Sequence, residues 1–142
     1  MIWVLDASVA VRWFLQEESH TNADCVLERL VHTPGSFAVQ ELFSFETLSV
    51  LQRLHPKPLD AFLEGIIPLL QGGILRYPMT SSLAERANRF VSKGLTGYDA
   101  CYAGLAEELE GEWLTFDKKA VTTLGNPKLA CCLAEGLPET WG

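Results

Sequence analysis

Short apolar runs alternate with longer helical patterns along all 142 residues of this chain. The apolar runs, each typical of a buried strand, lie at residues 2–5, 37–39, 74–77, 113–116 and 129–132. Helical patterns lie at residues 7–15, 21–31, 40–54, 59–70, 81–93, 96–111 and 118–124. Strands that alternate with helices favour a parallel sheet with helices on both faces. The sequence therefore predicts one α/β domain over residues 1–142, without a linker or an internal repeat.

Prolines and glycines mark the ends of several of these elements. The pair Pro34-Gly35 stops the helix at 21–31, and Pro56 follows the end of the helix at 40–54. Gly94 is the expected stop of the helix at 81–93. Pro68 lies inside the helical pattern at 59–70, where we expect it to bend or shorten the end of the helix.

Charge and cysteine content restrict the class of protein. A formal net charge of −7 argues against binding nucleic acid by overall attraction, although clustered acids can hold cations that reverse the local field. The four cysteines form no CxxC pair and no zinc-ligand spacing, so we expect reduced thiols. No stretch approaches the roughly 20 apolar residues that cross a bilayer, and an acid at position 6 interrupts any signal-peptide pattern. These features predict a cytoplasmic protein without a membrane segment.

Two aspartates directly follow predicted strands. Asp6 ends the apolar run at 2–5, and Asp117 ends the run at 113–116. In an open parallel sheet ligands bind beyond the carboxyl ends of the strands, so both side chains should lie on that edge. Asp is also a preferred N-cap residue, and capping of the next helix is an alternative role for each of them.

Two further acids lie inside predicted helices. In "TGYDA" Thr96 takes the N-cap position and Asp99 follows three residues later, so a capping box is the alternative to a functional role. Glu46 lies in mid-helix among apolar residues, where burial is costly unless a positive group pairs with the carboxylate. Arg53 or exposure to solvent would satisfy Glu46. A divalent cation would explain Glu46 and the three aspartates together.

The available donor atoms and the surrounding cations limit what such a site can bind. Mg²⁺ and Mn²⁺ prefer carboxylate oxygens, whereas the three histidines share no motif that would suit zinc. Lys118 and Lys119 adjoin Asp117 and are placed to meet substrate phosphates. A second basic group lies on one helical face at Arg86, Arg89 and Lys93, for which a solvated face is an equal alternative.

Four blocks of the sequence resemble the PIN-domain family, in particular its small toxin-type ribonucleases of VapC kind. They are "VLDASVAVRWF", "FSFETLSVLQR", "LTGYDACYAGLAEEL" and "WLTFDKKA". The resemblance implies a three-layer α/β/α fold with a central, mostly parallel sheet and an acidic pocket that holds Mg²⁺ or Mn²⁺ to cleave RNA. By position the acidic quartet, catalytic and metal-binding, is Asp6, Glu46, Asp99 and Asp117. Ser8 and Thr115 match supporting hydroxyl positions, while Ser49 stands where related sequences often carry asparagine.

The resemblance also implies a homodimer and a small antitoxin that masks the pocket. Apolar residues on the helices at 21–31 and 59–70 exceed what a small domain can bury, which agrees with a covered surface. A haloacid-dehalogenase-type phosphatase would need an aspartate where Ser8 stands, and a response-regulator receiver would need adjacent acids after the first strand. The sequence thus predicts a metal-dependent endoribonuclease of the PIN type, the toxin of a toxin–antitoxin pair. The alternative is a catalytically weak PIN-like module that acts through a protein partner.

Overall fold

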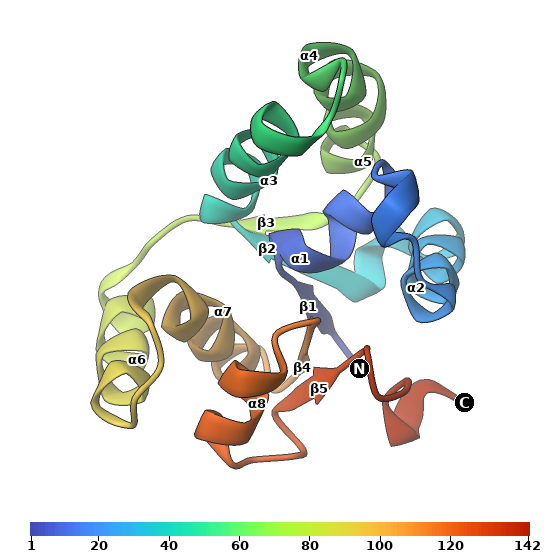
Figure 1. The fold of residues 1–142 in the computed structure, drawn as a ribbon. Coiled ribbons are helices and arrows are strands. Elements are labelled where there is room, and N and C mark those ends of the chain that lie inside the picture. Colours follow the sequence, from blue (N-terminus) through green and yellow to red (C-terminus); the bar gives the residue numbers. More distant parts are fainter.

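Five parallel strands form a single sheet at the centre of the molecule (Figure 1). The computed structural model describes residues 1–142 and places the strands in the order β3-β2-β1-β4-β5. Their bounds are β1 Trp3–Leu5, β2 Phe37–Gln40, β3 Leu75–Tyr77, β4 Glu112–Thr115 and β5 Ala130–Cys132. Each neighbouring pair is parallel, which confirms the predicted α/β class. The three central strands are buried along their whole length, as continuous apolar runs require.

Helices connect the strands and cover the sheet. They are α1 Ala7–Ala10, α2 Thr21–His32, α3 Leu42–Leu54, α4 Pro58–Ala61, α5 Ile67–Gln71, α6 Ser81–Ser92, α7 Gly97–Glu108 and α8 Lys118–Leu124. Short 3₁₀ turns occur at Val11–Trp13, Gln16–Glu18, Pro34–Ser36 and Glu139–Trp141. Helix α7 packs on β1, β2 and β4, and α6 packs on α7. Figure 1 shows α6 and α7 side by side.

Three predicted helices differ from the structure at their ends. The pattern at 7–15 becomes the short α1 followed by a 3₁₀ turn, and Gln40 belongs to β2 rather than to the next helix. Its side-chain oxygen accepts a hydrogen bond from the N–H of Leu42, the first residue of α3. Gln40 therefore satisfies a free N–H group of the first helical turn although it belongs to β2. The expected shortening at Pro68 is wrong, because the helix continues to Gln71.

A π-helical turn at Phe62–Ile66 accommodates Pro68. The N–H of Ile67 donates to the carbonyl of Phe62, five residues earlier. Proline supplies no N–H to the hydrogen-bond ladder, and one wider turn absorbs this mismatch without ending the helix. Gly94 does end α6 as predicted, with φ of 109° in the region that favours glycine.

The junction before β4 fixes how the first and fourth strands meet. A Cβ atom at Gly111 would lie 2.2 Å from the carbonyl oxygen of Ile2, so only glycine fits there. The next residue, Glu112, donates its N–H to that carbonyl at 3.0 Å. The resulting register pairs Leu5 with Leu114 and brings the carboxyl ends of β1 and β4 to the same edge of the sheet.

The cysteines, the helices and the exposed apolar side chains bear on three expectations from composition. All four cysteines are free thiols, and Cys132 is buried. None of the helices is long and apolar enough to span a lipid bilayer. Apolar side chains remain exposed on the predicted helices at 21–31 and 59–70, where Val31 is 64%, Leu59 61% and Leu63 53% exposed.

Candidate active site

Asp6 lies at the carboxyl end of β1 and is almost fully buried, with 5% exposure. Both the N–H and the hydroxyl of Ser8 donate to Asp6 Oδ1, and the N–H donates at 2.9 Å. The indole Nε1 of Trp113 donates to Asp6 Oδ2 at 3.0 Å. Burial raises the pKa of Asp6 to about 6, although these hydrogen bonds lower it. Asp6 is therefore the N-cap of α1 and at the same time a rigidly held carboxylate at the sheet edge.

Two hydroxyl groups connect the ends of β1 and β4. Ser8 Oγ lies 3.3 Å from Thr115 Oγ1 and accepts a hydrogen bond from the N–H of Phe116 at 3.0 Å. The hydroxyl proton of Ser8 goes to Asp6, so Thr115 must be the donor in the Ser8–Thr115 contact. Thr115 Oγ1 in turn accepts from the N–H of Asp117 at 3.1 Å. The two hydroxyls thus hold the backbone that leads into Asp117.

Asp117 follows β4 and is the N-cap of α8. Its Oδ1 accepts a hydrogen bond from the N–H of Ala120 at 3.0 Å, and the residue is exposed. The capping role that Asp commonly takes is therefore present here too. The capping hydrogen bond occupies Oδ1 of Asp117, and the other carboxylate oxygen is available to a ligand.

Asp99 lies in the first turn of α7 and is half-buried. Its N–H donates to the N-cap hydroxyl of Thr96 at 3.3 Å, as the capping box predicts. Burial, followed by the negative charges of Asp117 and Asp6, raises the pKa of Asp99 to about 6. Asp6 and Asp117, both distant from Asp99 in the sequence, therefore lie close enough to repel its charge.

Glu46 reaches the same region from the middle of α3. Burial raises the pKa of its carboxyl group, and the charge of Asp99 adds to this effect. Its Oε1 accepts a hydrogen bond of 2.6 Å from the hydroxyl of Tyr102. Arg53 is exposed and forms no ion pair with Glu46, so the alternative that Arg53 satisfies Glu46 is wrong.

None of these four carboxylates pairs with a positive side chain. The ion pairs of the chain involve other acids: Arg86 with Glu107 and Glu108, Arg89 with Glu107, and Lys118 with Glu135. No group of three Asp, Glu, His or Cys side chains is close enough to bind one metal ion between them. The structure thus brings the four acids to one edge without converging them into a preformed metal cage.

The donor chemistry of this edge nevertheless fits a hard divalent cation. Asp6 accepts three hydrogen bonds, which leaves roughly one of the about four lone-pair positions of a carboxylate free. Glu46 and Asp117 each accept one bond from the protein. Mg²⁺ takes one or two protein carboxylates and completes its shell with water, so it does not need a closed cage.

Two aromatic residues that the sequence patterns did not indicate contact this group of acids. Tyr102 lies on α7 and Trp113 on β4, and both are buried. Their rings stack with centroids 6.3 Å apart and an interplanar angle of 15°. One available signal was that a buried tyrosine or tryptophan needs a partner for its O–H or N–H group. A second was spacing, because Tyr102 lies three residues after Asp99, on the same helical face.

Comparison with known proteins identifies the family. The PIN domain profile matches residues 3–123, which is most of the chain. The chain belongs to the PIN domain family. No curated protein with which this PIN domain was compared gives a significant match.

Solved structures share the fold of this PIN domain at low sequence identity. FitAcB from Neisseria gonorrhoeae has a TM-score of 0.66 and 17% identity, covering 87% of this chain and 94% of that chain. PAE2754 from Pyrobaculum aerophilum has a TM-score of 0.64 and 20% identity, covering 87% and 84%. A toxin–antitoxin complex from Klebsiella pneumoniae has a TM-score of 0.61 and 17% identity, covering 83% and 88%.

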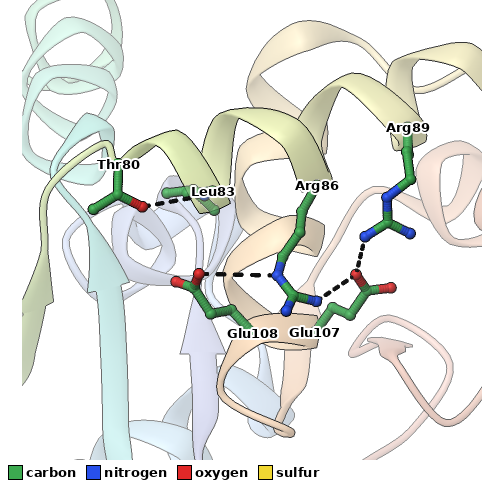
Figure 2. A network of polar contacts seen from close by, with 6 residues as sticks. All are labelled: Thr80, Leu83, Arg86, Arg89, Glu107 and Glu108. Carbon is green, nitrogen blue, oxygen red and sulfur yellow. Dashed lines mark hydrogen bonds and ion pairs between the residues drawn. The ribbon is translucent and has the colours of Figure 1, made fainter.

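The basic face of α6 in this PIN domain is engaged within the protein (Figure 2). Arg86 Nη1 lies 2.7 Å and Arg89 Nη2 2.6 Å from the same carboxylate oxygen of Glu107. Arg86 Nε lies 3.8 Å from Glu108. These pairs connect α6 to α7, and they favour the structural alternative over phosphate binding for Arg86 and Arg89.

The two lysines next to Asp117 are exposed. Lys118 Nζ lies 2.9 Å from Glu135 Oε1, whereas Lys119 forms no ion pair. A surface hollow of about 640 Å³ lies along β5 and the C-terminal segment, and none of the four acids lines it.

Proposed function

We propose that this PIN domain is an Mg²⁺- or Mn²⁺-dependent endoribonuclease. The observation that supports it most strongly is the gathering of Asp6, Glu46, Asp99 and Asp117 at one sheet edge without a positive partner. Burial raises the pKa of Asp6, Glu46 and Asp99, and the charges of neighbouring acids add to this for Glu46 and Asp99, so a cation bound there would relieve an existing electrostatic cost. Membership of the PIN domain family adds the reaction class.

The bound ion supplies Lewis-acid activation for phosphodiester hydrolysis and neutralises charge that develops on the phosphate. Asp6 and Asp99 take the central ligand roles, because Asp6 is almost fully buried and Asp99 is half-buried beside the charges of Asp117 and Asp6. Glu46 either binds the ion or orients a water molecule beside it. Asp117 is exposed and acts through water.

The remaining residues of the proposed site hold its geometry or receive the substrate. The hydroxyls of Ser8 and Thr115 fix Asp6 and the backbone of Asp117. Lys118 and Lys119 contact RNA phosphates, with Lys119 the stronger candidate because its ammonium group has no competing carboxylate.

The proposal extends to the biological role of a toxin in a toxin–antitoxin pair. It is supported by the shared fold with the toxin–antitoxin complex from Klebsiella pneumoniae. Phe45 on α3 is 70% exposed, and Leu59 and Leu63 follow on the elements that pack against α3. Exposed apolar side chains on adjoining elements suit a homodimer interface or a small antitoxin.

A nuclease assay tests the enzyme directly. The purified protein should cleave a defined single-stranded RNA with Mg²⁺ or Mn²⁺, and EDTA should abolish cleavage. Asp6→Asn and Asp99→Asn should each remove most of the activity, because each deletes a ligand charge. Equal cleavage by these variants and the wild type would assign the activity to a contaminant. A pure, folded and inactive wild type would favour the interaction module.

A further inference from the structure

The four acids at the sheet edge, Asp6, Glu46, Asp99 and Asp117, are called the acidic edge. Two of these carboxylates depend on aromatic side chains for a hydrogen bond. The hydroxyl of Tyr102 is the only hydrogen-bond partner of the Glu46 carboxylate, at 2.6 Å. Trp113 Nε1 is the only donor to Asp6 Oδ2, at 3.0 Å. Each contact spans a long stretch of sequence, 56 residues for the first and 107 for the second. The local backbone of α3 or β1 therefore supplies neither of them.

The two aromatic rings are themselves held firmly. Tyr102 is 1% and Trp113 0% exposed, and their rings stack nearly parallel. A ring packed in a core occupies one rotamer, so its polar atom has a fixed position. The contacts therefore run without a break from Asp6 through Trp113 and Tyr102 to Glu46, and they connect the end of β1 with the middle of α3.

We propose that Tyr102 and Trp113 are positioning residues that set the separation and orientation of Glu46 and Asp6 for cation binding. The inference rests on the proposed function and adds two residues to it. Tyr102 occupies Glu46 Oε1, which leaves Oε2 free for a ligand. Partners that orient metal-binding side chains typically change metal affinity or activity by about 10- to 100-fold when they are removed.

The opposite interpretation is that the acids merely satisfy two buried aromatic polar groups. A buried O–H or N–H needs a partner, and a carboxylate supplies one. In that case loss of the Tyr102 hydroxyl would change thermal stability and leave cation affinity unchanged. The two interpretations therefore differ in a binding measurement that does not depend on catalysis.

Tyr102→Phe separates them, because it removes only the hydroxyl and keeps the ring that stacks on Trp113. Titration calorimetry with Mn²⁺ should give a Kd at least about ten-fold higher than that of the wild type. Tyr77→Phe is the matched control, since the hydroxyl of Tyr77 on β3 has no hydrogen-bond partner, and its Kd should equal that of the wild type. Trp113→Phe tests the Asp6 side in the same way, and circular dichroism confirms the fold of each variant.

A double-variant comparison tests whether Tyr102 acts through Glu46. In a Glu46→Gln background the additional change Tyr102→Phe should leave the Kd for Mn²⁺ unchanged, because the group that Tyr102 orients no longer carries charge. Wild-type Mn²⁺ affinity in both Tyr102→Phe and Trp113→Phe would overturn the inference and leave the proposed function intact. Absence of Mn²⁺ binding by the wild type would contradict the proposed function, and the inference with it. If one variant does not fold, the other decides.

Discussion

At the scale of single residues, the acids of this site have two roles at once. Asp6 and Asp117 cap helices, and the same positions at the strand ends bring their charges together. An N-cap aspartate already has an oriented carboxylate, so capping prepares a ligand rather than competing with one. The sequence could predict these positions because each follows an apolar strand. It could not reveal the donors Tyr102 and Trp113, whose contacts depend on long-range packing.

The raised pKa values predict how the metal-free protein responds to pH. The folded-state pKa of Asp6 and of Asp99 is about 6, well above the ordinary value of 3.8. Between these values the folded state binds more protons than the unfolded state, so stability should increase as the pH falls from 7 towards 4. Thermal melts in EDTA at pH 7, 6 and 5 should therefore show a rising Tm.

The control for this prediction is Glu112, whose pKa is raised to about 7 by burial and by Glu139. Glu112→Gln removes that contribution, and the remaining slope of Tm against pH belongs to the four acids at the sheet edge. With saturating Mn²⁺ the slope should reverse, because protons compete with the cation for the carboxylates. A Tm that falls on acidification in EDTA would contradict the raised pKa values of Asp6 and Asp99.

At the scale of elements, strands were easier to predict than helix ends. Strands buried on both faces leave continuous apolar runs, and the predicted strands agree with the observed ones to within one or two residues. Helix ends depend on contacts that the local sequence does not contain. Gln40 joins β2 through ladder pairing with Tyr77, and Pro68 is absorbed by a π-helical turn. The sequence pattern at 59–70 predicted the helix but not this accommodation.

The position of each basic side chain on its element predicts its part in RNA binding. Lys119→Gln and Arg89→Gln each remove one exposed positive charge, from α8 and α6 respectively. Lys119→Gln should weaken RNA binding for all sequences and reduce the slope of log Kd against log salt by about 1. Arg89→Gln should leave RNA affinity unchanged and cost less than about 1 kcal/mol in stability, because its partner Glu107 lies near the surface.

Fluorescence anisotropy with a labelled RNA, measured at several salt concentrations, provides both slopes. Equal losses of affinity in the two variants would indicate attraction by overall charge instead of a defined contact. A loss of RNA affinity in Arg89→Gln alone would place the substrate over α6. It would contradict the structural role given to Arg89.

At the scale of the whole molecule, the fold is that of a PIN domain, and the chain leaves apolar side chains exposed around α3 and α4. The proposed homodimer would cover this surface. Light scattering should then give the mass of a dimer at micromolar concentration. Leu63→Glu should shift it to a monomer with little loss of Tm, because Leu63 is 53% exposed in the single chain. A wild-type monomer over the whole concentration range would exclude the homodimer.

The central claim is that the four acids form an electrostatically strained edge that a divalent cation relieves. Glu46→Gln tests it most directly, because it removes one charge and keeps an oxygen that can accept from Tyr102. In EDTA at pH 7 the variant should melt at the same temperature as the wild type or higher, since the pKa of Glu46 is raised in the fold. Added Mn²⁺ should raise the Tm of the wild type more than that of the variant. A variant that melts lower in EDTA, together with equal Mn²⁺ shifts for both proteins, would contradict the account.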